Sequence, residues 1–336
     1  MTACPYGFWV RGSKHAGREP VRAADAFAGF AACDPAARPD AEHYLSAFTY
    51  GDDFLAYLKT TGSTAQFAGP CCALWVWFDI DRGDDIDAAL ADARALSLHL
   101  EDGWGIAAET ILVFLSGKKG FHIGVPTALW GPAPSTDFHE VAHRFALALA
   151  RGAGGRGVVI DGSVYGKVQL FRAPNSRHPA TGLRKRRLTS DELLHLSIER
   201  IVGLAREPVA FDVPAPAARN EKLSAAWEQA AAAIAAEKAA MQERRAATGG
   251  AARLNALTLD FIREGAEEGG DGTADDAGRH RRLYAAAINL GEFGCPAPLA
   301  HALLTNAALD CGITPGEARR TIDNGLRNAG KEPPNV

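Results

Sequence analysis

An apolar segment that ends in two carboxylates constrains this chain more than any other feature. Residues 73–81 read Ala-Leu-Trp-Val-Trp-Phe-Asp-Ile-Asp, a run rich in aromatic and β-branched residues and too short for an independent helix. The segment therefore predicts a central strand of a sheet. Because side chains alternate between the two faces of a strand, Asp79 and Asp81 are expected on the same face.

The segments that follow predict further helices and strands. Apolar residues recur at helical spacing after Asp84 and Asp85 until Gly103, which predicts a helix. A turn with two lysines, Gly117-Lys118-Lys119-Gly120, joins two strand-like segments into a predicted hairpin. The strands of that hairpin are expected over 110–116 and 121–125, a helix over 136–151, and two short strands over 158–161 and 167–172.

Length and composition indicate a globular chain with about two domains. The chain has 336 residues, of which 47% are apolar and 23% charged, so it can bury a sizeable core. Prolines punctuate the chain after residue 206, an Ala-rich helix is expected at 224–247, and short helical patterns follow. We expect an α+β fold with a domain of mixed strands and helices over 1–205, a linker with the Ala-rich helix over 206–255, and a small all-helical domain over 256–336.

Several function classes are disfavoured by composition. The net charge of −4 does not indicate a nucleic-acid binder, so any basic surface must be local. The six cysteines include no CxxC pair, which disfavours a zinc ribbon or a disulfide framework. The longest central apolar run is far shorter than the ~20 residues that span a bilayer, and the N-terminus lacks a signal-peptide pattern. We expect a cytoplasmic protein with no membrane partner and no structural zinc.

The two strand-end carboxylates are candidate metal ligands. Paired carboxylates can bridge Mg²⁺ or Mn²⁺ ions, as in two-metal phosphoryl chemistry. Asp161, which follows the apolar run Val158-Val159-Ile160, is a candidate third ligand because it ends a second expected core strand. On its own, the Asp-x-Asp pair could instead cap the following helix, and this alternative stays open.

The predicted hairpin tip offers donors for an anion. In Ser116-Gly-Lys-Lys-Gly-Phe-His122, the glycines expose backbone N–H groups, and Ser116, Lys118, Lys119 and His122 can approach a triphosphate. The chain has no GxxxxGK[ST] sequence, which disfavours a P-loop ATPase or helicase. A surface hairpin with two solvated lysines is the alternative interpretation.

Basic residues concentrate in two places. Residues 166–187 contain seven bases and no acid, and four of the bases are consecutive. The four, Arg184, Lys185, Arg186 and Arg187, are either contacts for a nucleic-acid backbone or a solvated charge run. Arg279, Arg281 and Arg282 stand near the start of a predicted helix, where free N–H groups also favour phosphate.

Taken together, Phe-Asp79-Ile-Asp81, Ser116-Gly-Lys-Lys-Gly-Phe-His122 and Val-Ile-Asp161 resemble, in order and spacing, the three motifs of the archaeo-eukaryotic primase superfamily. The resemblance implies an RRM-like catalytic sheet beside an N-terminal α/β half. It implies primer synthesis on a single-stranded DNA template from NTPs or dNTPs, with two Mg²⁺ or Mn²⁺ ions on the three aspartates. In the stretch from Leu170 to Gly182, it also implies that Arg172, Ser176 and His178 approach the incoming nucleotide.

The helical C-terminal segment resembles that of phage- and plasmid-type primase-polymerases. The chain departs from other relatives, because its cysteines cannot build the zinc site of cellular primases and it carries no fused helicase. We therefore expect a compact form, encoded by a mobile element, that works with a separately encoded helicase. Two other functions stay open. A rolling-circle replication nuclease needs a His-hydrophobe-His pair, of which only His122 is present, and a non-catalytic single-strand-binding module needs aromatic stacking platforms.

Overall fold

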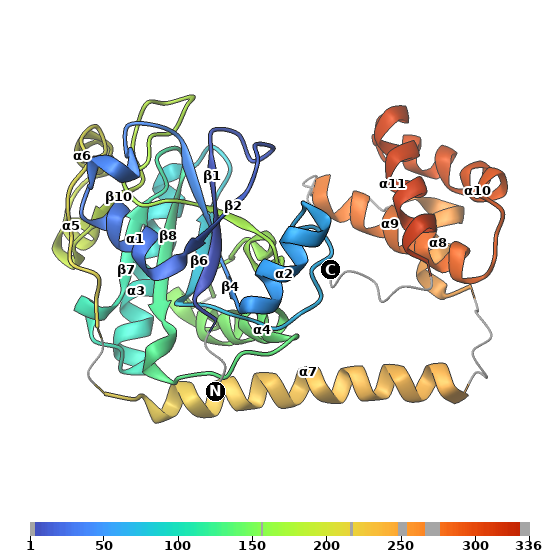
Figure 1. Cartoon of the computed structure of the whole chain (residues 1–336), viewed down its shortest axis with the longest axis horizontal. Coiled ribbons are helices and arrows are strands. Elements are labelled where there is room, and N and C mark those ends of the chain that lie inside the picture. Colours follow the sequence, from blue (N-terminus) through green and yellow to red (C-terminus); the bar gives the residue numbers. More distant parts are fainter. Residues whose placement is uncertain (1–3, 156, 216–217, 248–253, 266–275, 330–336) are drawn as a thin grey trace. The chain divides into compact units, whose positions relative to one another are not determined.

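The computed structural model describes residues 4–155, 157–215, 218–247, 254–265 and 276–329. The chain divides into two compact units, Met1–Ala235 and Ala236–Val336 (Figure 1). The first unit contains two antiparallel sheets with helices, and the described part of the second unit is helical. The fold class is therefore α+β, as the sequence predicts.

The first sheet has six strands in the order β5-β4-β1-β3-β9, with β2 paired to β1. All of its ladders are antiparallel. Most of its strands come from the start of the chain, but β9 joins from far along the sequence. The strands are β1 (Tyr6–Arg11), β2 (Glu19–Arg22), β3 (His43–Ser46), β4 (Thr49–Tyr50), β5 (Cys71–Cys72) and β9 (Leu170–Arg172), accompanied by α1 (Ala23–Ala31) and α2 (Asp52–Thr61).

The second sheet contains the predicted hairpin and the carboxylate strand, in the order β10-β7-β8-β6. Its apolar strands and the helices around them form where the sequence predicts them, because their periodicity is local. β6 lies at the edge of the hydrogen-bonded ladder, so the expected central position is wrong. The elements are β6 (Trp75–Asp81), α3 (Ile86–Trp104), β7 (Leu112–Leu115), β8 (Gly120–Pro126), α4 (Phe138–Ala150) and β10 (Arg186–Leu188).

The strand expected over 158–161 does not form. The segment runs beside the free edge of β6, but a single backbone hydrogen bond joins them, from Asp161 N–H to the Asp79 carbonyl at 2.9 Å. The Asp161 side chain accepts the Ser163 N–H at 2.8 Å and so caps the 3₁₀ turn Gly162–Tyr165. The chain therefore turns away from β6 before a second ladder bond can form.

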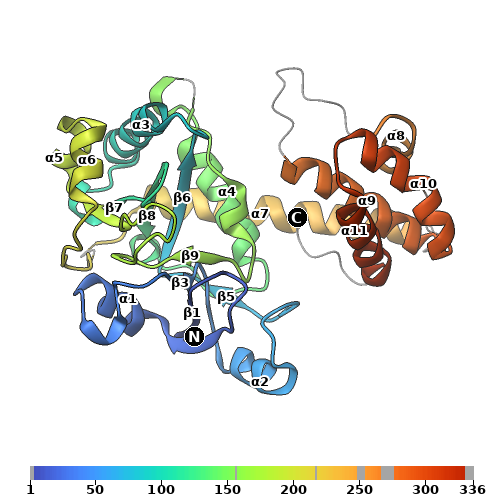
Figure 2. The same ribbon diagram turned by 90° about the horizontal axis from the view of Figure 1, so that it is seen from above.

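The two faces of β6 have different partners. Trp75 and Trp77 contact rings of the first sheet and its helix: the Trp75–Phe27 centroids are 6.0 Å apart and the Trp77–Phe171 centroids 5.1 Å apart. The opposite face is covered by α3 and α4. Figure 2 shows β1, β3 and β9 on one side of β6 and α3 on the other. By alternation, Asp79 and Asp81 share the tryptophan face, which looks toward the first sheet.

Three more helices follow the second sheet: α5 (Ser190–His195), α6 (Ile198–Leu204) and α7 (Glu221–Ala247). The first part of α7 belongs to the first unit, because Trp227 packs against Phe138 at 4.9 Å, Phe145 at 5.3 Å and Trp130 at 5.7 Å between ring centroids. Residues 206–235, assigned to a linker by sequence, thus lie inside the first compact unit.

The second unit has its own apolar core. Buried side chains from the last four helices of the chain form this core, among them Phe261, Leu283, Leu304 and Ile322. Among the described helices of the whole chain, none combines the length and apolar character needed to cross a bilayer. These four helices, which follow the end of α7 in the second unit, are α8 (Ala256–Glu264), α9 (Asp276–Glu292), α10 (Ala297–Asp310) and α11 (Pro315–Asn328).

Candidate active site

The structure brings the three predicted aspartates to one end of β6. Asp79 and Asp81 end this strand on the face toward the first sheet. Asp161 lies beside Asp79 through the backbone hydrogen bond that joins the two segments. Burial, and after it the negative charges of Asp161 and Asp81, raise the pKa of Asp79 to about 7. The three carboxylates are therefore close enough to repel one another.

Repelling carboxylates are stabilised by a divalent cation, and their oxygens are the hard donors that Mg²⁺ and Mn²⁺ prefer. The donor set fits such ions in its chemistry. Within the described ranges, however, no three His, Cys, Asp or Glu side chains are grouped as ligands of one ion. Asp81 accepts the Gly83 N–H at 2.8 Å and lies 3.5 Å from Lys119 Nζ, and Asp161 accepts from Ser163. Side-chain rotation is thus needed before all three bind one ion.

Two basic residues lie in the interior behind Asp79. Nε2 of His122 is 3.4 Å from Asp79 Oδ1, and its ring lies 4.2 Å from that of Phe171. The buried Lys185 has its Nζ 4.0 Å from the Phe171 ring centroid and donates to the Arg172 carbonyl at 2.9 Å. Burial lowers the pKa of both groups well below their ordinary values, and the Arg172 charge lowers them further. Both side chains are buried.

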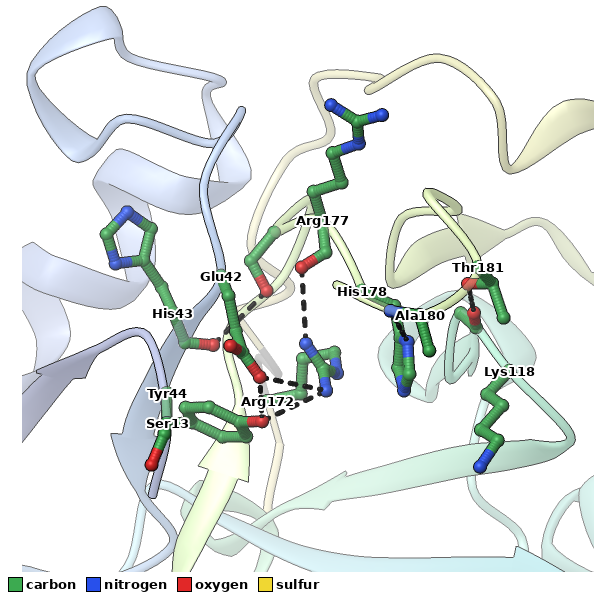
Figure 3. Close-up of polar contacts among 12 residues, drawn as sticks. Ser13, Glu42, His43, Tyr44, Lys118, Arg172, Arg177, His178, Ala180 and Thr181 are labelled. Carbon is green, nitrogen blue, oxygen red and sulfur yellow. Dashed lines mark hydrogen bonds and ion pairs between the residues drawn. The ribbon is translucent and has the colours of Figure 1, made fainter. Parts of the chain in front are cut away.

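Three further basic residues form a basic cluster (Figure 3): Lys118 at the hairpin tip, Arg172 on β9 and His178 in the following loop. Burial lowers the pKa of His178, and the positive charges of Arg172 and Lys118 lower it further. The Ala180 N–H donates to His178 Nδ1 at 3.2 Å, so the proton of the neutral ring lies on Nε2. The three side chains together can donate to the oxygens of one polyphosphate.

The hairpin tip is fixed to the loop that carries His178. Thr181 Oγ1 donates to the Gly117 carbonyl at 2.6 Å. Gly117 has φ +91°, and a Cβ there would meet the Arg184 backbone at 3.2 Å, so only glycine suits this turn. Ser116 Oγ accepts the Gly120 N–H at 3.2 Å, so this hydroxyl closes the turn and is not part of the basic cluster. Lys118 is the exposed lysine of the tip, because Lys119 is directed to Asp81.

The Ser176 side chain is not part of the basic cluster. It is fully buried, and its hydroxyl donates to the Ala173 carbonyl at 2.7 Å and lies 3.2 Å from the His43 carbonyl. The expected contact of this residue with the nucleotide is therefore corrected to a role in folding the loop after β9.

The basic run 184–187 is not the exposed strip that its composition suggests. Arg184 and Lys185 are buried, and Arg184 pairs with Asp40 at 2.5 Å. Arg186 pairs with Glu192 at 3.5 Å, and Arg187 donates to the Ile111 carbonyl at 2.9 Å. The end of the run belongs to β10, which pairs with β7 at the edge of the second sheet. Backbone carbonyls and two acids there accept the hydrogen bonds and ion pairs of its side chains. The expected nucleic-acid contacts of these four residues are corrected accordingly.

Replacing Arg184 with alanine is expected to destabilise the fold by about 2 kcal/mol, because it removes buried charge-assisted hydrogen bonds. Urea denaturation measures this loss. The salt dependence of single-stranded DNA binding should not change, whereas loss of one phosphate contact would lower its slope by ~0.7. Arg200→Ala, on the exposed face of α6, is the matched control and should change neither quantity. A lower slope with unchanged stability would restore Arg184 to the nucleic-acid surface.

The basic residues of α9 are divided between exposed and internal positions. Arg281 and Arg282 are exposed, whereas Arg279 donates to the Cys311 carbonyl. A contact of this helix with nucleic acid therefore depends on the two exposed arginines, and it stays a prediction.

Comparison with known proteins gives little. No family model matches the chain, and no curated protein does. Among solved structures, the chain is similar to one described as the crystal structure of primase RepB', with 13% sequence identity and a TM-score of 0.35, over 99% of this chain and 92% of that chain. A likeness this distant carries no argument about fold or function. We therefore take the function from the geometry of the site and the sequence motifs.

Proposed function

We propose that this chain is a template-dependent nucleotidyltransferase that synthesises primers on single-stranded DNA and extends them. The observation that carries the proposal is that Asp79, Asp81 and Asp161 meet at the end of β6, where Lys119 joins Asp81 to the hairpin tip that carries the basic cluster of Lys118, Arg172 and His178. Carboxylates beside basic side chains suit a reaction on a nucleoside triphosphate. The order of these motifs along the chain, which resembles that of the archaeo-eukaryotic primases, supports the same reaction.

The residues have separate roles in this proposal. Asp79, Asp81 and Asp161 would hold two Mg²⁺ or Mn²⁺ ions, which when bound offset negative charge at the α-phosphate and favour attack by a 3′-oxygen. Lys118, Arg172 and His178 bind the triphosphate and orient it. His122 and Lys185 lie behind Asp79 and fix the position of its carboxylate and of the β9 backbone. Ser163 holds the Asp161 carboxylate beside the strand end.

The alternatives are less well supported by the site. A non-catalytic single-strand-binding module would present aromatic rings to bases. The rings of Trp77, Phe114 and Phe171 are instead buried around Lys185. A rolling-circle nuclease would need a second histidine beside His122. The residue two before it on β8 is Gly120, and the residue two after is Gly124.

One experiment separates the three functions. The full chain is incubated with unprimed circular single-stranded DNA, labelled NTPs or dNTPs, and Mg²⁺ or Mn²⁺, and the products are resolved on a denaturing gel. Labelled short products on intact circles support the proposal. Linearised circles joined to the protein would favour the nuclease, and binding without either product would favour the binding module. Addition of a separately encoded helicase should be needed only on duplex templates.

A further inference from the structure

Arg172 makes more contacts with the protein than Lys118 and His178, the other two residues of the basic cluster. Its side chain is 11% exposed, and its Nη1 donates to the Arg177 carbonyl at 3.3 Å. Its Nη2 donates to the hydroxyl of Tyr44 at 3.1 Å, and its guanidinium carbon lies 4.9 Å from the centre of the Tyr44 ring. A flexible arginine ordinarily loses side-chain entropy when it binds a phosphate. Here the protein has already fixed the conformation.

The backbone places Tyr44 and Arg172 opposite each other. Tyr44 on β3 and Arg172 on β9 are direct partners in the antiparallel ladder of the first sheet. Directly opposed residues project to the same side of a sheet, with Cβ atoms about 5 Å apart. The contact between the ring and the guanidinium is thus set by strand register, and does not depend on a mobile loop.

Glu42, just before β3, determines which way the Tyr44 hydroxyl points. Its Oε1 accepts a hydrogen bond from the Tyr44 hydroxyl and lies 3.8 Å from Arg172 Nη2. A carboxylate can only accept, so the hydroxyl proton is directed to Glu42 and an oxygen lone pair is left for Arg172. Burial and the neighbouring Glu42 also raise the pKa of Tyr44, which keeps the hydroxyl protonated. Figure 3 shows this chain of contacts on the side of Arg172 opposite His178.

We propose that Glu42 and Tyr44 are positioning residues that hold the Arg172 guanidinium within the basic cluster it forms with Lys118 and His178, ready to bind the triphosphate of a nucleotide. The inference rests on the proposed function for the identity of the ligand. It adds two residues outside the three motifs, and it gives the first sheet a part in substrate binding. Neither residue touches the reacting atoms.

Tyr44→Phe is the direct test, because it keeps the ring beneath the guanidinium and removes only the hydroxyl, which accepts from Arg172 and donates to Glu42. The loss of one hydrogen bond is expected to weaken binding of a non-hydrolysable nucleoside triphosphate about fivefold in calorimetric titration. The KM for nucleotide should rise by the same factor while kcat stays within about twofold, since the reacting groups are unchanged. Tyr57→Phe is the matched control, because it also removes a tyrosine hydroxyl, but one that donates to the Ala65 carbonyl at 2.5 Å rather than to Glu42.

A double-mutant cycle with Arg172→Lys decides whether Tyr44 acts through Arg172. Lysine keeps the charge but lacks the planar fork, so Tyr44→Phe should have less than a twofold effect in the Arg172→Lys background. An undiminished effect there, or a Tyr44→Phe protein that binds like Tyr57→Phe, would overturn the inference. The titration needs no turnover. A chain that binds the analogue but incorporates no nucleotide would therefore contradict the proposed function alone.

Discussion

Replacing Asp79 with asparagine is expected to lower nucleotide incorporation by at least about 1,000-fold. A metal ligand in a phosphoryl-transfer site contributes several kcal/mol of transition-state stabilisation, and each 1.36 kcal/mol corresponds to tenfold in rate. The amide keeps the shape of the side chain but loses the negative charge. Initial rates on a primed template with Mg²⁺ or Mn²⁺ measure the loss. Asp87→Asn, at an exposed position in the first turn of α3, is the matched control and should retain full activity.

The same variant should not lose stability, which separates loss of function from unfolding. Because burial and the nearby carboxylates raise the pKa of Asp79 from 3.8 to about 7 in the folded protein, the metal-free fold loses stability as the pH rises between these values, and the loss is complete above pH 7. Removing the charge should therefore raise the melting temperature at pH 8 by at least about 2 °C, and by less at pH 5, where the folded protein already holds the proton. Wild-type rates for Asp79→Asn would refute its role in catalysis.

Replacing Arg172 with alanine is expected to raise the KM for nucleotide by about 10- to 100-fold. Charge-assisted hydrogen bonds to phosphate contribute about 1.5–3 kcal/mol, and the pre-ordered guanidinium is placed to make them. Steady-state kinetics with varied nucleotide concentration measure the change.

Arg177→Ala provides the matched control for Arg172. Its side chain is exposed and is directed away from Lys118 and His178, and its backbone carbonyl accepts from Arg172 (Figure 3). The KM of this control should stay within about twofold of wild type, because the carbonyl is retained. Equal KM values for the two variants would remove Arg172 from the nucleotide site.

The elements that carry the site could be predicted because their signals are local. The alternation in 75–81 and the Gly-Lys-Lys-Gly turn lie within single stretches of sequence, and they form β6 and the β7–β8 hairpin. Helix α3 begins after Asp85, whose side chain accepts the Ala88 N–H at 2.9 Å, as expected of an N-cap residue. Local periodicity also predicts α9, α10 and α11 of the second unit, whereas α8 has no such pattern.

Burial of polar residues could not be predicted in the same way. The sequence predicts a solvated run at Arg184 to Arg187 because three of these residues donate to backbone carbonyls, those of Pro39, Ile111 and Arg172. Every residue has a backbone carbonyl, so the sequence does not indicate which one accepts. Burial of Lys185 could not be predicted either, because the three rings that surround its Nζ come from three different strands, β6, β7 and β9. The segment 158–161 looks like a strand, but only one ladder bond to β6 is available to it.

The positioning residues also lacked a sequence signal. Glu42 and Tyr44 are more than 100 residues from Arg172 along the chain, and only the pairing of β3 with β9 brings them together. No spacing rule connects two strands whose order in the sheet is unknown.

The central claim is that the three carboxylates and the basic cluster of Lys118, Arg172 and His178 serve templated synthesis, and template dependence tests it most directly. The full chain is given homopolymeric dT or dC single strands, Mn²⁺, and each labelled nucleotide separately. We predict that only adenine nucleotides are incorporated on dT and only guanine nucleotides on dC, and that Asp79→Asn incorporates neither. Incorporation that ignores the template, or none on either template, would contradict the account.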